Sequence, residues 1–143
     1  MENLKETLKT LKDLIFILQD SNDSYQNAAE IVDNPSVKDY LLINSRERAF
    51  YLLQLQDEME KLGQPYNDSG YYIHKTWNSL KNAFTFDTFL SKCIQTEEKL
   101  RSKYLASLKE VNFYSSLSLV LQNQLLGIEK TLMHMKNYQL QVN

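Results

Sequence analysis

The sequence predicts an all-α protein that folds as an antiparallel four-helix bundle. Apolar residues recur every three or four positions over most of its 143 residues, which places them along one face of each helix. The chain has only three glycines and two prolines, far fewer than a β-sandwich, a barrel or a glycine-loop nucleotide fold requires. Its 43% hydrophobic and 24% charged residues are typical of one globular domain, which we expect to span residues 1–143.

A first pair of helices is expected over residues 3–33 and 35–62. The first helix ends before Pro35, because the residue that precedes a proline disfavours helical backbone. Asn34 caps the next helix, and Gly63 is its expected stop. Two long helices joined by so short a turn must lie antiparallel.

A second pair of long helices is expected over residues 86–111 and 115–139, again joined by a short turn. The connection between the two pairs should contain a shorter helix over residues 69–84. At about 1.5 Å per helical residue plus extended flanks, this connection can traverse the bundle. A long crossover between two antiparallel hairpins is the ferritin-like arrangement, as distinct from up-down-up-down. The prediction is therefore a ferritin-like antiparallel four-helix bundle with a long helical crossover between the second and third helices.

Polar residues interrupt the apolar seams at about the same height in all four helices. Reflecting the first hairpin about its turn places Asn22 level with Glu47 and Arg48. Reflecting the second places Glu97 level with Gly127. The predicted mid-bundle polar layer consists of Asn22, Ser45, Glu47, Arg48, Glu97 and Gln124.

Within this layer we expect an ion pair between Arg48 and Glu97, because a buried charge without its partner costs about 3–5 kcal/mol. Gly127 would leave room for the Glu97 side chain or for a water molecule. The remaining donors and acceptors of the layer should be satisfied by its uncharged members, Asn22, Ser45 and Gln124. A layer of this kind sets helix register and adds little net stability.

In ferritin-like metalloproteins a pair of metal ions lies at this level of the bundle. Glutamates and Glu-x-x-His motifs bind the two ions. Neither His74 nor His134 has a glutamate three residues before it. Arg48 would also bring a positive charge into the space that two cations need. We therefore expect no metal, no other cofactor and no catalytic site. The open alternative is a di-iron or di-manganese protein with an unusual carboxylate set, Glu47, Glu97 and Asp20 or Asp23.

Aromatic side chains crowd the expected crossover, where they could serve as a clamp or as an interface. They are Tyr66, Tyr71, Tyr72 and Trp77. We expect them to hold the crossover against the bundle, with Trp77 buried, because large aromatics bury much area while their polar tips reach solvent. A dimer interface is the alternative, since aromatics are enriched at interfaces.

Charge and hydropathy narrow the range of partners. Lys and Arg number 16 against 18 Asp and Glu, so no basic excess is present to bind nucleic acid. The longest apolar run, residues 14–18, is far too short to span a membrane, and the N-terminus lacks a signal-peptide pattern. We expect a cytoplasmic protein that binds a second copy of itself or another protein. A sensor that binds a small apolar ligand between helices is a third option.

Four stretches resemble a bacterial ferritin-like four-helix-bundle family of unknown function. They are residues 20–30 (DSNDSYQNAAE), 44–63 (NSRERAFYLLQLQDEMEKLG), 68–80 (DSGYYIHKTWNSL) and 93–104 (CIQTEEKLRSKY). Their most specific parts are Tyr25 with Ala28-Ala29-Glu30, the Glu47-Arg48 pair, and Ser69-Gly70 followed by Trp77. None of these motifs is catalytic, so the resemblance implies a fold and not a reaction.

The resemblance also implies a bacterial cytoplasmic protein and, by analogy with some members, an association with stress. In this family the fourth helix carries Gln followed by Glu and His, whereas here Gln124 is followed by Gly127 and Leu132. That departure argues further against a metal site. We therefore expect a non-catalytic structural or interaction module.

Overall fold

A computed structural model describes residues 2–66, 86–111 and 114–142 of the chain. The expected crossover helix over residues 69–84 lies outside the described residues, and so do Tyr71, Tyr72 and Trp77. The described part forms four helices and contains no strand, which confirms the all-α prediction. They are α1 (Glu2–Ile31), α2 (Pro35–Lys61), α4 (Phe86–Glu110) and α5 (Ser115–Val142).

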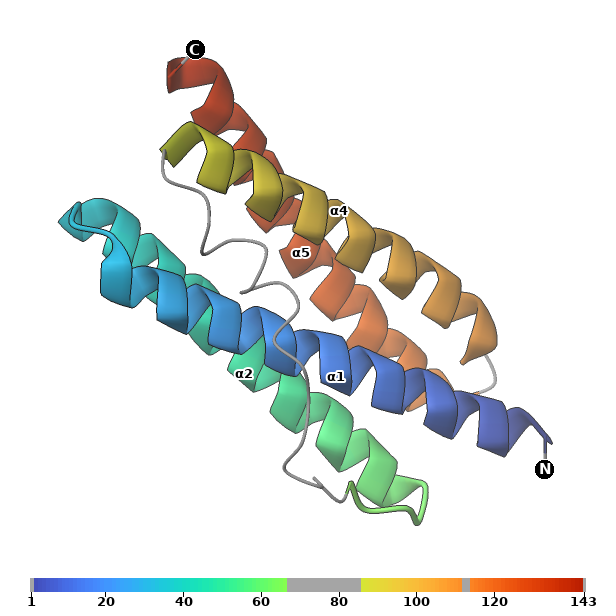
Figure 1. Cartoon of the computed structure of the whole chain (residues 1–143). Coiled ribbons are helices and arrows are strands. Elements are labelled where there is room, and N and C mark those ends of the chain that lie inside the picture. Colours follow the sequence, from blue (N-terminus) through green and yellow to red (C-terminus); the bar gives the residue numbers. More distant parts are fainter. Residues whose placement is uncertain (1, 67–85, 112–113, 143) are drawn as a thin grey trace.

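The helices form two antiparallel hairpins that pack against each other (Figure 1). Within the hairpins, α1 packs on α2 and α4 packs on α5. Between the hairpins, α1 packs on α4 and α2 packs on α5. The end of α2 and the start of α4 lie at opposite ends of the bundle, so these two helices run parallel. This is the ferritin-like order predicted from the connection lengths, in which every neighbouring pair is antiparallel.

Local signals at the helix ends explain where α2 begins and stops. The Asn34 side chain accepts hydrogen bonds from the backbone N–H groups of Ser36 at 2.9 Å and Val37 at 3.3 Å. Gly63 has a φ of 81°, a conformation that costs other residues strain. The other ends differ slightly from the prediction: α1 stops at Ile31, before the turn, and α5 continues to Val142.

The core consists of two apolar clusters that lie on either side of mid-bundle. The larger cluster contains Leu11, Leu14, Ile15, Leu18, Tyr51, Leu52, Leu55, Met59, Leu100, Tyr104, Val111, Leu117, Leu121, Leu125 and Ile128. The smaller cluster contains Tyr25, Ala28, Ala29, Leu41, Phe89, Leu90, Cys93, Ile94, Leu132 and Met135. Arg48 and Glu97 fall in the sequence gaps between the two sets, so the charged residues separate the clusters.

Candidate functional site

The centre of the bundle is an ion pair between α2 and α4. Arg48 is fully buried and Glu97 is 1% exposed. The guanidinium Nη2 of Arg48 donates a hydrogen bond to Glu97 Oε1. Because neither charge reaches water, each depends on the other for compensation. The structure thus joins the two hairpins through the two residues that the sequence singles out as core charges.

Two further residues complete the cluster around this pair. Nη1 of Arg48 donates to Glu47 Oε1 at 3.0 Å, so the guanidinium bridges two carboxylates. The Tyr25 hydroxyl of α1 donates to the same Glu97 oxygen as Arg48. The Tyr51 ring lies 5.8 Å from the Arg48 guanidinium carbon, close enough for a cation–π contact. We call Tyr25, Glu47, Arg48, Tyr51 and Glu97 the central cluster.

Tyrosines are the part of this site that sequence reasoning missed. Tyr25 lies on an apolar seam of α1, so the pattern counts it as a core residue and gives no sign that its hydroxyl binds Glu97. Tyr104 is similar: its hydroxyl donates to Gln124 Oε1 at 2.6 Å. A tyrosine at a seam position next to a predicted polar layer is the signal that could have found both.

The uncharged members of the predicted layer do not satisfy the ion pair. Asn22 and Ser45 hydrogen-bond to each other across the first hairpin. Gln124 accepts from Tyr104 and donates to the Tyr51 carbonyl at 3.2 Å and to Gln54 Oε1 at 3.0 Å. The polar residues therefore form three groups, and the Gln124 group meets the central cluster only at the backbone carbonyl of Tyr51. The single shared layer expected from the sequence is wrong in this respect.

The height expected from reflecting the second hairpin is wrong by about one helical turn. In the second hairpin, Arg101 Nε donates to Glu129 Oε2 at 2.9 Å, and Gln139 donates to Ser91 at 2.8 Å. This register places Glu97 level with residues 131–133, not with Gly127. In the first hairpin the difference is smaller, because Asn22 bonds to Ser45, two to three residues before Glu47 and Arg48. The larger error in the second hairpin arises because its turn is centred a few residues beyond the break assumed from the sequence.

Gly127 makes room for a different side chain from the one expected. An ideal Cβ at this position would lie 1.9 Å from the Tyr51 hydroxyl oxygen and 3.7 Å from Glu47 Oε1. The absence of a side chain on α5 thus creates space for the tip of Tyr51 from α2. The expectation that Gly127 accommodates Glu97 is wrong.

The pKa values of Tyr25, Tyr51 and Arg48 are all raised, although burial acts in opposite senses on the tyrosines and on the arginine. Burial raises the pKa of Tyr25 well above its usual value, and the Glu97 carboxylate raises it further. Burial, reinforced by Glu47, raises the pKa of Tyr51 to about 12. For Arg48, burial is the largest single influence and lowers the pKa, but Glu97, Tyr25 and Glu47 together outweigh burial and the net shift is upward. The tyrosines therefore stay neutral and the arginine stays charged at physiological pH.

Two atoms of the ion pair lack partners within the described chain. Arg48 Nε and Glu97 Oε2 are both buried and form no hydrogen bond there. An unmatched carboxylate oxygen in the core is the one feature of this site that would suit a cation.

The surrounding donor set does not fit a pair of metal ions. The described residues contain no group of three His, Cys, Asp or Glu side chains that could share a metal. The Arg48 guanidinium, which donates to both Glu47 and Glu97, already neutralises the carboxylates that would have to bind the metals. His134 is exposed on α5, and no such group among the described residues includes it.

One of the aromatic residues expected in the crossover is described. Tyr66 is half-buried, packs against the larger apolar cluster, and its hydroxyl donates to Gln19 Oε1 at 3.4 Å. It thus attaches the chain after α2 to α1, and the choice between a clamp and an interface for the whole aromatic set stays a prediction.

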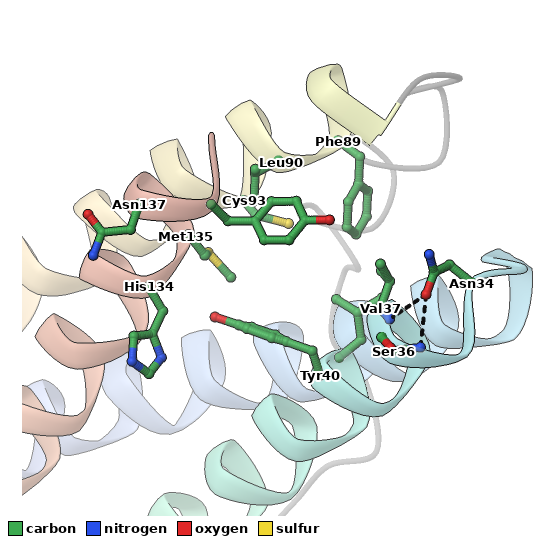
Figure 2. A pocket seen from close by; sticks show the side chains of 12 residues that line it. Asn34, Ser36, Val37, Tyr40, Phe89, Leu90, Cys93, His134, Met135 and Asn137 are labelled. Carbon is green, nitrogen blue, oxygen red and sulfur yellow. Dashed lines mark hydrogen bonds between the residues drawn. The ribbon is translucent and has the colours of Figure 1, made fainter. Parts of the chain in front are cut away.

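A cavity of about 470 Å³ opens at the end of the bundle where α2 begins (Figure 2). Its apolar walls come from α2, α4 and α5. They include Val37, Tyr40, Leu41, Phe89, Leu90, Cys93 and Met135. Burial, and then the Glu97 carboxylate, raise the pKa of Cys93, so its thiol is neutral and behaves as an apolar wall. Tyr40 and His134 supply polar groups at the rim (Figure 2).

The order and packing of the four helices define a ferritin-like helical bundle. A solved structure described as ferritin-like, diiron-carboxylate proteins from Bacillus anthracis str. Ames matches with a TM-score of 0.66. The match covers 99% of this chain and 95% of that chain at 14% sequence identity, so it shows the fold alone. No curated protein matches the chain significantly.

The chain belongs to the DUF2383 family, a domain of unknown function, whose model matches residues 6–110. The matched segment contains α2 and α4 and therefore both members of the central ion pair. The resemblance drawn from the sequence motifs is thereby confirmed at the level of the family and of the ferritin-like fold. Among the described residues, no helix has the length and apolar character needed to cross a membrane.

Proposed function

We propose that this protein is a non-catalytic helical-bundle module that acts through contacts with other protein surfaces. The observation that carries the proposal is the position of Arg48, whose buried guanidinium binds Glu97 and Glu47 at the centre of the bundle. A permanent side-chain cation occupies the place where a ferritin-like metal protein holds its metals. The buried core then stabilises the fold, and the outer surface makes the contacts with other proteins.

The chemistry of the central cluster supports this proposal. A general acid or base needs a pKa near the working pH, whereas the pKa values of Tyr25 and Tyr51 are raised away from neutrality. A reactive cysteine needs a stabilised thiolate, whereas burial raises the pKa of Cys93. None of these groups is prepared for acid–base or nucleophilic chemistry.

The competing hypothesis is a di-iron or di-manganese protein with an altered ligand set, and metal retention separates the two. Purified protein is incubated aerobically with Fe(II) or, separately, Mn(II), desalted, and analysed for bound metal. We expect no stoichiometric retention, because Arg48 neutralises the core carboxylates.

The matched variants are Glu97→Gln, which changes the buried carboxylate, and Glu98→Gln, which changes its half-exposed neighbour. Retention of about two metals per chain that Glu97→Gln abolishes and Glu98→Gln preserves would overturn the proposal.

The proposal also covers the class of partner, the cellular location and the biological role of the protein. Its balance of 16 basic and 18 acidic residues favours protein partners over nucleic acid or a membrane surface. We propose a bacterial, cytoplasmic protein with a role in stress, and the observation behind this extension is membership of its family. Localisation of a tagged full-length chain in its host tests the first part.

A second candidate function, binding of a small apolar molecule, is favoured by the cavity of about 470 Å³. Ligand pockets commonly have volumes of about 300–1,000 Å³ and mostly apolar walls. The test is fluorescence of the dye anilinonaphthalene sulfonate with wild type, Leu90→Trp and Leu105→Trp. Leu90 is a wall of the cavity, whereas Leu105 is a partly exposed residue elsewhere on α4. Dye binding that only Leu90→Trp abolishes supports this function, and equal binding by all three contradicts it.

A further inference from the structure

The outer face of α5 carries a regular stripe of exposed apolar side chains. Its members are Leu119, Leu126, Met133 and Leu140. They are spaced seven residues apart, and each is between 59% and 76% exposed. Seven residues are nearly two helical turns, so these side chains form a single line along the helix. This is the seam of a helix that packs against another helix, and within the described chain it faces solvent.

The same helix is depleted of charge. Glu129, Lys130 and Lys136 are the three charged residues of α5, whereas α1, α2 and α4 each carry nine. Exposed helices in soluble proteins normally present charged outer faces, and loss of charge at the centre of a patch is typical of an interface. The low charge of α5 therefore supports a role for its outer face in contact with protein.

Apolar exposure continues onto α2, which packs beside α5. Ile43 and Phe50 of α2 are 60% and 57% exposed. Hydrogen bonds from Ser116 to Glu58 and from Gln124 to the Tyr51 carbonyl set the register of the two helices. Phe50 therefore lies at about the level of Leu126. The patch thus widens at the middle of the stripe, where an interface core is expected.

We propose that the α5 stripe is a homodimer interface, in which α5 packs antiparallel to α5 of a second copy. The twofold axis passes between Glu129 and Lys130, midway along the stripe. This arrangement sets Leu126 against Met133 of the partner subunit and Leu119 against Leu140 of the partner subunit. The inference deepens the proposed function, on which it rests, by naming the surface and the partner.

Symmetry and charge favour a second copy over an unrelated partner. A twofold interface requires one patch to be complementary to itself, and a stripe with even spacing about its midpoint meets that condition. The axis also brings Glu129 opposite Lys130 of the partner subunit, and Lys130 opposite Glu129 of the partner subunit. Lys130 is exposed, and Glu129, which also binds Arg101 at 2.9 Å, is partly exposed. The two charges nearest the axis are therefore complementary.

The test measures the oligomeric state of the full-length chain by sedimentation velocity over the micromolar range. We expect the wild type to form dimers and Leu126→Glu to be monomeric with an unchanged helical circular dichroism spectrum. Ile31→Glu is the control, because Ile31 is 60% exposed on α1, away from the stripe. It should remain dimeric. A monomeric wild type, or equal loss of dimer in both variants, would overturn the inference.

Two further experiments, a charge exchange and a cross-link, test the position of the axis. Lys130→Glu should weaken the dimer, because it places two glutamates opposite each other, and Glu129→Lys combined with Lys130→Glu should restore it. Under mild oxidation Lys130→Cys should give a disulfide-linked dimer and Ile31→Cys should not. The native Cys93 is buried and does not interfere. Failure of both the charge exchange and the cross-link would exclude this antiparallel arrangement.

The oligomeric state and the metal retention together distinguish failure of the dimer interface from failure of the proposed non-catalytic role. A monomer that retains no metal overturns the interface and leaves the non-catalytic role in place. A dimer that retains two metals through Glu97 supports the interface and overturns the non-catalytic role.

Discussion

The hydroxyl of Tyr51 occupies the space that a side chain at position 127 would fill. An ideal Cβ on Gly127 would approach this hydroxyl oxygen to 1.9 Å and the ring carbon that bears it to 3.2 Å. The contact joins α2 to α5 beside Glu47, next to the central ion pair. A glycine in the middle of a helix is thus explained by the neighbouring helix and not by its own backbone.

Gly127→Ala should destabilise the protein by about 1–3 kcal/mol, which is the usual cost of overpacking a core. Helix propensity alone predicts the opposite, since alanine is favoured over glycine in a helix interior by about 1 kcal/mol. Chemical denaturation followed by circular dichroism measures the difference. The matched variant is Tyr51→Phe with Gly127→Ala, which removes the 1.9 Å contact and should recover stability. A stabilised single variant would refute the steric account.

Glu97→Gln should lower the free energy of unfolding by about 3–5 kcal/mol, because it removes the buried counter-charge of Arg48 and leaves only the partly exposed Glu47. The change keeps the shape of the side chain and removes only the charge. Urea denaturation of the variant and of Glu98→Gln provides the comparison, since Glu98 is half-exposed and pairs with Lys136. An unchanged denaturation midpoint for Glu97→Gln would show that the pair is not a determinant of stability.

Removing both charges should lower the free energy of unfolding by less than the sum of the two single changes. Arg48→Met with Glu97→Met leaves neither charge buried alone, whereas each single change strands its partner in the core. A double-mutant cycle built from denaturation midpoints gives the coupling free energy, which we expect to be favourable by about 1–3 kcal/mol. Additive effects would mean that Arg48 depends on Glu47 more than on Glu97.

The fold should lose stability as the pH rises above 10. The pKa of Tyr51 is about 12 in the folded chain against 10.0 for an exposed tyrosine, and burial raises the pKa of Tyr25 and Tyr104 as well. Between these values the unfolded chain has released protons that the folded chain keeps, so stability falls by up to about 1.4 kcal/mol per pH unit for each tyrosine. Below pH 10 the contribution of these residues is fully present.

Denaturation midpoints from neutral pH to pH 12, together with tyrosinate absorbance, check this dependence. Tyr51→Phe should flatten the decline. A midpoint that stays constant between pH 10 and pH 12 would contradict the assigned shifts.

The sequence determined the helices, their order and their antiparallel pairing, because these follow from short-range chemistry. The spacing of apolar residues defines each seam, and Asn34 and Pro35 end one helix and start the next. The long stretch between α2 and α4 was sufficient to indicate the crossover. Arg48 and Glu97 could also be identified as partners, because two opposite charges on apolar seams have few alternatives.

Only the tertiary structure decided which polar atoms meet. Register between helices depends on where each turn is centred and on how side chains interlock, and an error of one turn changes every partner. Glu97 is joined by Tyr25 and not by Gln124, and Gly127 accommodates Tyr51 and not Glu97. These contacts connect residues far apart in the chain, so no local pattern encodes them. The physical reason is that a helix face is set by neighbouring residues, whereas the height at which two faces meet is set by packing of the whole bundle.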